Sequence, residues 1–296
     1  MKRILISGKD SYVGTAVDAY LEQYPKYYQI ETLDMKGNKW REASFSAVDV
    51  VFHVAGIAHS EVMKADEETK KLFDQVNTKL TIETAKKAKE AGVGQFIFMS
   101  SMIVFGDSAK IGKPKMIHKG TKPKPANFYG DSKLKAEIAL EKLASADFKV
   151  VILRPPMIYG YGSKGNFPYL VKLIKKLPFF PKLNNKRSML YIENLCKFLK
   201  LMIDNEERGI FHPQNEAYVS TAKMAREIAK VQGQRLVLTR VFNPFVWLLS
   251  KRLRIVNKVF GNFSYAKEMS EYREPYQVCD FVESIRRSVS VVSLVE

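Results

Sequence analysis

The first half of the chain alternates short apolar runs with longer segments in which apolar residues recur every three or four positions. Short apolar runs predict strands, and the longer periodic segments predict helices. The expected strands are 3–7, 28–34, 48–55, 95–101 and 148–156, and the expected helices are 17–24, 80–92 and 129–145. Strands that alternate with helices predict βαβ units. The expected fold is α/β, a doubly wound parallel sheet covered on both faces.

The pattern changes after Pro155 and Pro156. Helical segments are expected at 167–177, 194–204 and 221–233, joined by loops that contain Pro, Asn and Gly. The apolar run 188–192 predicts one more strand, which returns to the main sheet. We therefore expect a dinucleotide-binding domain over residues 1–160, to which 186–208 return, and a smaller C-terminal substrate lobe over 161–185 and 209–296.

The segment ISGKDSYVG, residues 6–14, joins the first strand to the first helix and carries the spacing Gly8-x-x-Ser11-x-x-Gly14. In a Rossmann-type fold such a turn holds a pyrophosphate with backbone N–H groups and a helix N-terminus. Gly8 would permit the tight turn, and Gly14 would permit close packing of helix on strand. Ser11 stands where such loops usually have a glycine, although its hydroxyl can donate to a phosphate. The alternative is a structural turn without a ligand.

Asp34 ends the second expected strand, twenty residues after Gly14. A carboxylate there accepts hydrogen bonds from the adenosine ribose and favours NAD over NADP. Three cations follow closely and would instead suit the 2′-phosphate of NADP: Lys36, Lys39 and Arg41. We expect NAD, with NADP as the alternative.

The segment FYGDSK, residues 128–133, places Tyr129 and Lys133 four residues apart on one helix face. A nearby ammonium lowers the pKa of a phenol and makes it an acid/base for a hydroxyl or carbonyl group. Among the 14 tyrosines, only Tyr129 has a lysine four residues later. Ser101 ends an expected strand, at the edge where ligands gather, and could donate to the reacting oxygen. Together these residues predict a catalytic site rather than a surface pair.

With these motifs the chain resembles the extended short-chain dehydrogenase/reductases of the NAD-dependent nucleotide-sugar epimerase/dehydratase family, over nearly its whole length. Further motifs that carry the resemblance are HVAG (53–56), Asn77, FMSS (98–101), LRPPMIYG (153–160), GNFPYL (165–170) and RSMLYIENL (187–195). More narrowly, RPPMIYG, GNFPYL, LPFFPKLNNKRS (177–188) and FGNFSYAK (260–267) resemble the capsule and O-antigen branch. That branch includes 4-epimerases and reductases of UDP-4-keto-6-deoxy-hexosamines.

The resemblance implies a role for each matching residue. Tyr129 would be the acid/base at the sugar 4-oxygen, Lys133 would hold the nicotinamide ribose and tune Tyr129, and Ser101 would orient the 4-oxygen. The implied cofactor-binding residues are Gly8, Ser11, Tyr12, Val13, Gly14, Asp34, Ala55, Gly56, Asn77, Ser100, Tyr129, Lys133 and Pro156. The implied residues that bind the nucleotide sugar are Ser101, Met157, Asn166, Phe180 and Arg187.

The chain departs from the family pattern at three further points. Met157 replaces an asparagine, Phe105 replaces a tyrosine, and the C-terminal R-P-G-D motif is absent, which leaves the diphosphate to Arg187 or to another arginine that the motifs do not locate. The motifs do not separate two reactions at the 4-position. We expect reduction of a UDP-4-keto-6-deoxy-hexosamine for surface polysaccharide synthesis. The first alternative is a redox-neutral UDP-hexose or UDP-N-acetylhexosamine 4-epimerase, and the second is a dinucleotide-binding protein without catalysis.

The formal net charge is +17. Such a charge indicates either an anionic partner or a lysine-rich solvated surface. Because the lysines are spread along the chain, we favour the lysine-rich solvated surface, and no nucleic-acid-binding motif is present.

Residues 243–263 mix large apolar side chains with Lys251, Arg252, Arg254 and Lys258. That segment could lie on an anionic membrane, but we favour a helix packed over the substrate lobe.

Cysteine and hydropathy patterns bear on compartment. Cys196 and Cys279 lie outside any C-x-x-C pattern, and no metal-ligand spacing occurs, so no metal is expected. There is no signal peptide and no run of about 20 apolar residues. We expect a cytoplasmic enzyme, and the family resemblance implies a homodimer.

Overall fold

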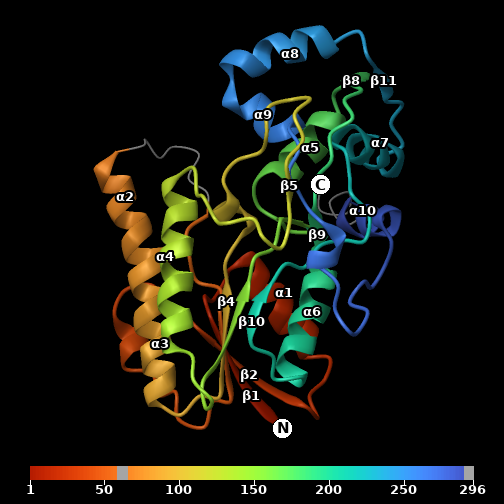
Figure 1. Cartoon of the computed structure of the whole chain (residues 1–296). Helices are drawn as coiled ribbons and strands as arrows, with labels where there is room; N and C mark the ends of the chain where they lie inside the picture. Colours follow the sequence, from red (N-terminus) through yellow and green to blue (C-terminus); the bar gives the residue numbers. More distant parts are fainter. Residues whose placement is uncertain (59–65, 290–296) are drawn as a thin grey trace. The chain divides into compact units, whose positions relative to one another are not determined.

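The computed structural model describes residues 1–58 and 66–289, which divide into two compact units. The first unit comprises Met1–Gly106, Lys122–Pro155 and Leu195–Pro213. The second comprises Asp107–Thr121, Pro156–Asn194 and Gln214–Glu296. Each unit is built from segments that are distant in the sequence, as the colours of Figure 1 show.

A six-stranded parallel sheet forms the first unit. Its strands are β1 (Lys2–Ser7), β2 (Tyr28–Leu33), β3 (Val50–His53), β4 (Gln95–Met99), β6 (Lys149–Leu153) and β10 (Gly209–Phe211). Their order across the sheet is β10-β6-β4-β3-β1-β2. All five pairings are parallel. The expected α/β doubly wound fold is confirmed, and the chain order reverses between β1 and β3, which is where ligands bind in such sheets.

Helices cover both faces of this sheet. They are α1 (Tyr12–Leu21), α2 (Glu67–Phe73), the π-helix η2 (Asp74–Lys79), α3 (Leu80–Glu90), α4 (Phe128–Leu143) and α6 (Ile192–Asp204), with short 3₁₀ turns η1 (Lys39–Arg41) and η3 (Met102–Phe105). Figure 1 shows α3 and α4 side by side on one face and α1 on the other. Helix α1 begins at Tyr12, five residues before the expected start, because Ser11 caps it.

The core lies between the sheet and its helices. All four residues of β3 and all five of β4 are buried, as expected of strands covered on both faces. A cluster of large side chains from neighbouring strands fills one side: Val51, Phe96, Phe98, Phe148 and Val150. The continuous apolar runs of the sequence therefore mark the interior strands.

The second unit contains small sheets and helices. Its helices are α5 (Asn166–Ile174), α7 (Thr221–Val231), α8 (Asn243–Arg252), α9 (Arg254–Phe260) and α10 (Phe281–Val289), with the 3₁₀ turn η4 (Lys267–Met269). Three two-stranded parallel sheets join β7 (Met157–Tyr159) to β9 (Met189–Tyr191), β8 (Phe179–Pro181) to β11 (Val237–Thr239), and β5 (Met116–Ile117) to β12 (Ser264–Tyr265). Among the helices described in either unit, none is long and apolar enough to cross a membrane.

The expected return of residues 188–192 to the main sheet is wrong. The strand forms as β9, but it pairs with β7 in the second unit. The main sheet instead gains β10, which sequence analysis did not predict. Parallel strands in one sheet need a crossover connection, usually a helix. Along the chain, α6 follows β9 and precedes β10. Strand β10 is therefore the strand that α6 connects to the main sheet, where it pairs with β6.

Candidate active site

The turn after β1 is shaped to bring backbone close to a ligand. Gly8 has a φ of +122°, and a Cβ there would lie 2.8 Å from the backbone nitrogen of Ala55. No other residue fits this position without displacing the β3 end. A Cβ on Gly14 would lie 2.5 Å from Ser11 Oγ and 3.2 Å from a side-chain carbon of Val54. Both glycines therefore keep the roles expected of them, at the point where the strand order reverses.

Ser11 takes over the middle position of the loop by capping α1. Its Oγ accepts a hydrogen bond from the backbone nitrogen of Gly14 at 3.1 Å. This bond satisfies one of the N-terminal donors of the helix and leaves the hydroxyl proton available to an acceptor. Tyr12 and Val13 form the first turn of the same helix, and both are partly buried. With Ser11 as its cap, α1 therefore still begins at this turn, and a helix N-terminus is a place where a bound anion is stabilised.

Asp34 directly follows β2 and is exposed. One of its carboxylate oxygens accepts from the backbone nitrogen of Lys36 at 2.9 Å, which fixes the orientation of the side chain. Arg41, one of the three cations that would suit a 2′-phosphate, instead donates to Glu83 at 2.7 Å. Lys36 and Lys39 remain exposed. The local arrangement suits ribose hydroxyls and leaves fewer cations for NADP.

The end of β3 forms a second backbone wall. Asn77 bonds both polar groups of Ile57: its Oδ1 accepts from the nitrogen at 2.9 Å, and its Nδ2 donates to the carbonyl at 3.0 Å. A Cβ on Gly56 would lie 2.9 Å from Asn77 Oδ1 and 3.2 Å from Lys133 Nζ. Ala55 is buried beside it. The predicted residues Ala55, Gly56, Asn77 and Lys133 are therefore brought together.

Helix α4 positions the predicted acid/base. Asn127 caps the helix by accepting from the nitrogen of Gly130 at 2.9 Å. A Cβ on Gly130 would lie 2.8 Å from the carbonyl oxygen of Ile103, so the first turn packs directly on η3. Ser101 caps η3 in the same way. This close approach sets the hydroxyl of Ser101 beside the phenol of Tyr129, with which it interacts.

The pKa values of Tyr129 and Lys133 differ from expectation. Lys133 Nζ is buried and donates to the carbonyl of Met99 at 2.8 Å. Burial lowers the pKa of Lys133 to about 8, although Glu137 opposes the shift. The pKa of Tyr129 is raised, because burial outweighs the opposing hydrogen bond from Ser101. The expected lowering of the phenol pKa by Lys133 is therefore wrong for this arrangement, in which the ammonium is directed to a backbone carbonyl.

A buried ion pair beneath the site was not predicted. Arg154, directly after β6, donates to Glu137 on α4 at 2.6 Å, and both side chains are buried. The hydroxyl of Ser100 donates to the same carboxylate. The hydroxyl of Ser100 is therefore engaged in this ion pair. The sequence signal was present: Glu137 lies one turn after Lys133, on the buried face of α4.

The remaining predicted residues lie in the second unit. Pro156 precedes Met157, which begins β7, and Asn166 is the exposed first residue of α5. Phe180 is buried, with its ring 5.8 Å from that of Phe260, so it contributes to the packing of this unit. Arg187 also lies in this unit.

Among the residues that the structure describes, the guanidinium of Arg187 is held by neutral oxygens and pairs with no carboxylate. Its guanidinium donates to the carbonyls of Lys258 at 2.9 Å and Gly261 at 3.1 Å and to the hydroxyl of Ser108 at 3.3 Å. Burial lowers its pKa to about 10. Carbonyl oxygens hold the side chain in place without neutralising it. A desolvated guanidinium of this kind retains its charge for an anion, and diphosphates are its usual complement.

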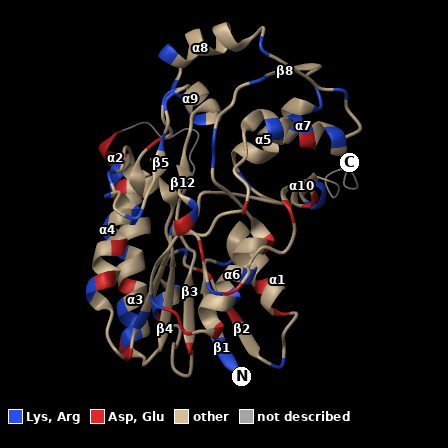
Figure 2. Cartoon of the chain, turned by 45° about the vertical axis from the view of Figure 1, so that its right-hand side comes forward, with Lys and Arg blue, Asp and Glu red and all other residues tan. Residues whose placement is uncertain are grey.

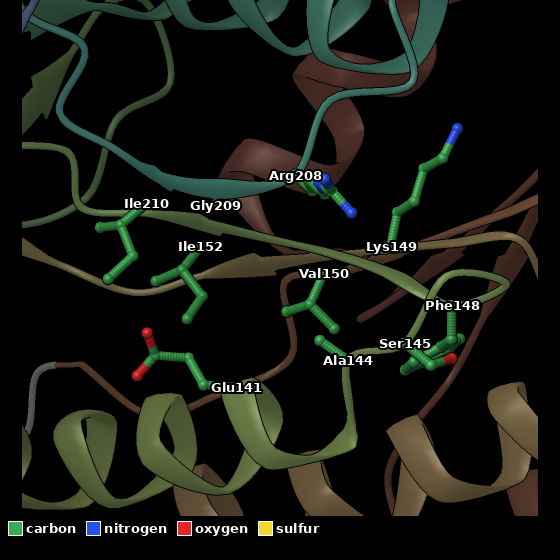
Figure 3. Close-up of a pocket in the computed structure, with 10 residues that line it drawn as sticks. All are labelled: Glu141, Ala144, Ser145, Phe148, Lys149, Val150, Ile152, Arg208, Gly209 and Ile210. Atoms are coloured by element: carbon green, nitrogen blue, oxygen red, sulfur yellow. The ribbon is translucent and has the colours of Figure 1, made fainter.

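A hollow in the first unit lies away from these residues. It has a volume of about 490 Å³ and lies between the end of α4 and strands β6 and β10 (Figure 3). Glu141, which lines it, is twelve residues after Tyr129 on α4, or about 18 Å along the helix axis. The hollow follows from the position of β10 as an edge strand, and it is separate from the residues that carry chemistry.

Comparison with known proteins identifies the family. The model of the NAD dependent epimerase/dehydratase family matches residues 4–219. The UDP-glucose 4-epimerase of Vibrio cholerae is 34% identical over 304 residues, which cover 93% of this chain and 91% of the relative. The N-acetyl-alpha-D-glucosaminyl-diphospho-ditrans,octacis-undecaprenol 4-epimerase of Escherichia coli O157:H7 is 24% identical and covers 80% of this chain and 70% of the relative.

Solved structures share the fold. The UDP-glucuronic acid 4-epimerase of Bacillus cereus in complex with NAD superposes with a TM-score of 0.74 at 14% identity, over 99% of this chain and 100% of that one. The family match spans well over half of the chain, and the glycine turn, the Tyr129–Lys133 pair and the doubly wound sheet agree with it. The chain belongs to the NAD dependent epimerase/dehydratase family of extended short-chain dehydrogenase/reductases, and it is an enzyme of that family with NAD(P) as its cofactor.

Proposed function

We propose that this enzyme exchanges a hydride at the 4-position of a UDP-sugar and that its net reaction is 4-epimerisation. One observation carries the chemistry: the phenol of Tyr129, the hydroxyl of Ser101 and the ammonium of Lys133 gather at the carboxyl edge of the sheet, beside a glycine turn. The direction of the net reaction rests on the 34% identical relative, named as a UDP-glucose 4-epimerase.

The residues fit a dinucleotide. The Gly8–Gly14 turn leaves room where a Cβ would collide with backbone, and the α1 N-terminus offers donors to a pyrophosphate. Asp34 would accept from the adenosine ribose, and Lys133 would bind the nicotinamide ribose beside Gly56. When bound, the nicotinamide would accept and return a hydride at the sugar carbon.

Tyr129 would move the matching proton. Its neutral phenol, favoured by burial, can donate to a 4-oxo group, and its phenolate can take the proton of a 4-hydroxyl. Ser101 would donate to the same sugar oxygen and hold it in line with the phenol. Lys133 would act by holding the nicotinamide ribose beside this pair, since its ammonium is directed to the Met99 carbonyl.

Arg187 would bind the diphosphate of the substrate. Its charge is held by neutral oxygens, so an anionic group would be its first opposite charge. The absence of a second motif arginine makes this residue the principal phosphate ligand in the proposal. Replacement of Arg187 by methionine should weaken UDP binding by at least about tenfold, since a buried charge-assisted bond contributes over 1 kcal/mol.

Reduction is the second candidate. The motifs RPPMIYG and GNFPYL and the segment 177–188 resemble the capsule and O-antigen branch, which includes reductases of UDP-4-keto-6-deoxy-hexosamines. A reductase would use the same Tyr129 proton in one direction only. It would also consume NADH or NADPH in stoichiometric amounts.

One assay separates the two candidates. Purified protein is incubated with UDP-glucose, or UDP-N-acetylglucosamine, and catalytic NAD, and the 4-epimer is quantified by chromatography. A parallel reaction contains a UDP-4-keto-6-deoxy-hexosamine and reduced nicotinamide, whose absorbance is followed. Formation of the 4-epimer without net reduction of the NAD supports epimerisation. Stoichiometric loss of absorbance with the keto sugar, and no epimer from the others, rejects epimerisation in favour of reduction.

A further inference from the structure

The surface formed by α8, α9 and the loop before them is unusually apolar. In the described part of the chain seventeen large apolar side chains are exposed, and eight lie between residues 237 and 255. They are Val237, Val241, Phe242, Phe245, Trp247, Leu248, Leu253 and Ile255. We call this set the α8–α9 face. Contiguous exposed apolar patches of this kind mark interaction sites.

The two helices bury almost nothing against their own unit. Val246 is the sole buried residue of α8, and α9 has none. Phe245 is 61% exposed, Trp247 52% and Leu248 59%. Helix α8 is therefore not packed over the substrate lobe as the sequence favoured, whereas α9 contacts its own unit through Phe260, whose ring lies 5.8 Å from that of Phe180. An amphipathic helix whose large side chains point outward lacks the burial that ordinarily stabilises it, so a partner is expected on this face.

The charge around the face has one sign. Between Glu227 and Glu268 the sequence contains eight Lys and Arg residues and no Asp or Glu. Between Asp147 and Glu193 it contains nine basic residues and again no acid. These two acid-free segments together contain as many basic residues as the whole net charge of +17. The lysines are spread along the chain, but the acids are excluded from these two segments.

Residues 148–155 lie in the first unit, and the fold brings residues 156–192 and 228–267 together in the second unit. Strand β8 of one pairs with β11 of the other, with Phe179 opposite Val237. Asn243 at the start of α8 donates to the carbonyl of Lys182 at 3.0 Å. Figure 2 shows α8 and α9 with basic residues but no acidic ones. The basic residues nearest the exposed apolar side chains are Lys182, Arg240, Lys251, Arg252, Arg254 and Lys258.

This combination fits the surface of an anionic bilayer. Aromatic and aliphatic side chains enter the boundary between headgroups and acyl chains, while lysine and arginine contact lipid phosphates. Trp247 illustrates both parts, because the ammonium of Lys251 lies 4.7 Å from the centre of its ring. A second copy of this chain is a poorer partner, since a symmetric contact would oppose cation to cation. We propose that the α8–α9 face docks this enzyme on an anionic membrane surface, independently of which sugar it converts.

Intrinsic fluorescence offers a direct test. The chain has two tryptophans: Trp40 is 1% exposed and Trp247 is 52% exposed. Full-length protein with the Trp40→Phe substitution reports on Trp247 alone. Vesicles of phosphatidylcholine with phosphatidylglycerol should shift its emission to the blue at low salt, and the protein should sediment with them. Vesicles of phosphatidylcholine alone should give a much weaker response, and high salt should reverse most of the binding.

Matched variants distinguish binding through the α8–α9 face from binding that depends on net charge alone. Lys251→Glu with Arg252→Glu should weaken binding by about tenfold or more, since each basic residue near a lipid surface contributes a severalfold factor. Lys86→Glu with Lys142→Glu makes the same change in net charge on exposed residues of α3 and α4 and should leave binding within about twofold. Phe245→Ser with Leu248→Ser should also abolish most binding, whereas Leu72→Ser with Ile138→Ser should not.

Two results would overturn the proposal. One is the absence of sedimentation and of any Trp247 shift at low salt with anionic vesicles. The other is an oligomer of the parent chain, measured by analytical ultracentrifugation, that is lost in the Phe245→Ser/Leu248→Ser variant. In that case vesicle binding by the parent chain would be absent, or both charge-pair variants would bind vesicles equally. The latter would assign the face to a second copy. Apart from Trp40, every substituted side chain is exposed, and circular dichroism and thermal melting verify that each variant, Trp40→Phe included, folds.

Discussion

Lys133 is a buried cation, and its replacement by methionine should stabilise the protein. Burial lowers the pKa of Lys133 from its ordinary 10.5 to about 8. A shift of this size corresponds to a cost of about 3 kcal/mol for the charged form in the folded state. Methionine has a similar length and carries no charge. It loses the bond to the Met99 carbonyl, which costs about 1 kcal/mol, so a net gain of about 2 kcal/mol is expected at pH 7.

The pH dependence gives the sharper measurement. Between pH 8 and 10.5 the unfolded chain holds the Lys133 proton more than the folded chain does, so unfolding free energy rises with pH in this window. The cost is complete below pH 8 and disappears above 10.5. The stability gap between the Lys133→Met variant and the parent should therefore shrink by about 2 kcal/mol from pH 7 to pH 10. Urea unfolding at a series of pH values measures the gap directly.

The control is Lys142→Met on the same helix. Lys142 is exposed, so its substitution should change stability by less than about 0.5 kcal/mol at every pH. All other titrating groups are shared and cancel in the comparison. A Lys133→Met gap that stays constant from pH 7 to pH 10, or a variant that is less stable throughout, would refute the account of Lys133 as a charge held at a cost in stability for function.

Three further predictions concern the site. Tyr129→Phe should lower turnover by about 10²- to 10⁴-fold with an unchanged circular dichroism spectrum, while Tyr161→Phe, an exposed control, should retain full activity. Glu137→Gln should lose about 3 kcal/mol in urea unfolding because it leaves the buried Arg154 charge unpaired, and a loss no greater than that of exposed Glu141→Gln would contradict the ion-pair assignment. Gly8→Ala should weaken NAD binding, measured by calorimetry, by at least about tenfold, whereas Gly37→Ala, which shares the positive φ but meets no neighbour, should bind NAD normally; equal affinities would refute the close approach at Ala55.

The sheet could be predicted because its strands are short and apolar throughout. Strands β1, β3, β4 and β6 are buried on both faces, so each appears in the sequence as an uninterrupted apolar run. Strand β10 could not be found this way. It is three residues long, lies at the edge of the sheet and has an exposed first residue, Gly209. Residues 188–192 have a more apolar sequence than β10, but which strand they pair with depends on the crossover at α6. That crossover is a feature of the topology, which hydrophobic periodicity does not reveal.

The site residues could be predicted where a backbone requirement or a helical spacing leaves a mark. Gly8 and Gly14 are required by contacts that any Cβ would violate, and Tyr129 and Lys133 share one helix face. The direction of the Tyr129 pKa could not be predicted, because it depends on where the ammonium points. In the structure Lys133 bonds to the Met99 carbonyl, so desolvation dominates the phenol. The position of Glu137 on the buried face of α4 could be read from its spacing to Lys133, but its partner could not, since Arg154 lies 17 residues away and meets it only through β6 and α4.

The net charge shows how a composition can mislead when one sign alone is counted. The lysines are spread along the chain, which favoured a uniformly solvated surface. What is uneven is the distribution of acids, several of which pair with basic residues of the first unit, as Glu83 does with Arg41. They are absent from 148–192 and from 228–267. An electrostatic field depends on the uncompensated charge. Within the two segments Lys149, Arg154 and Lys230 pair with acids that lie outside them. The excess therefore belongs to the other basic residues of the segments, which meet beside the exposed aromatic residues of α8, and a solvated surface explains neither the missing acids nor the exposed rings.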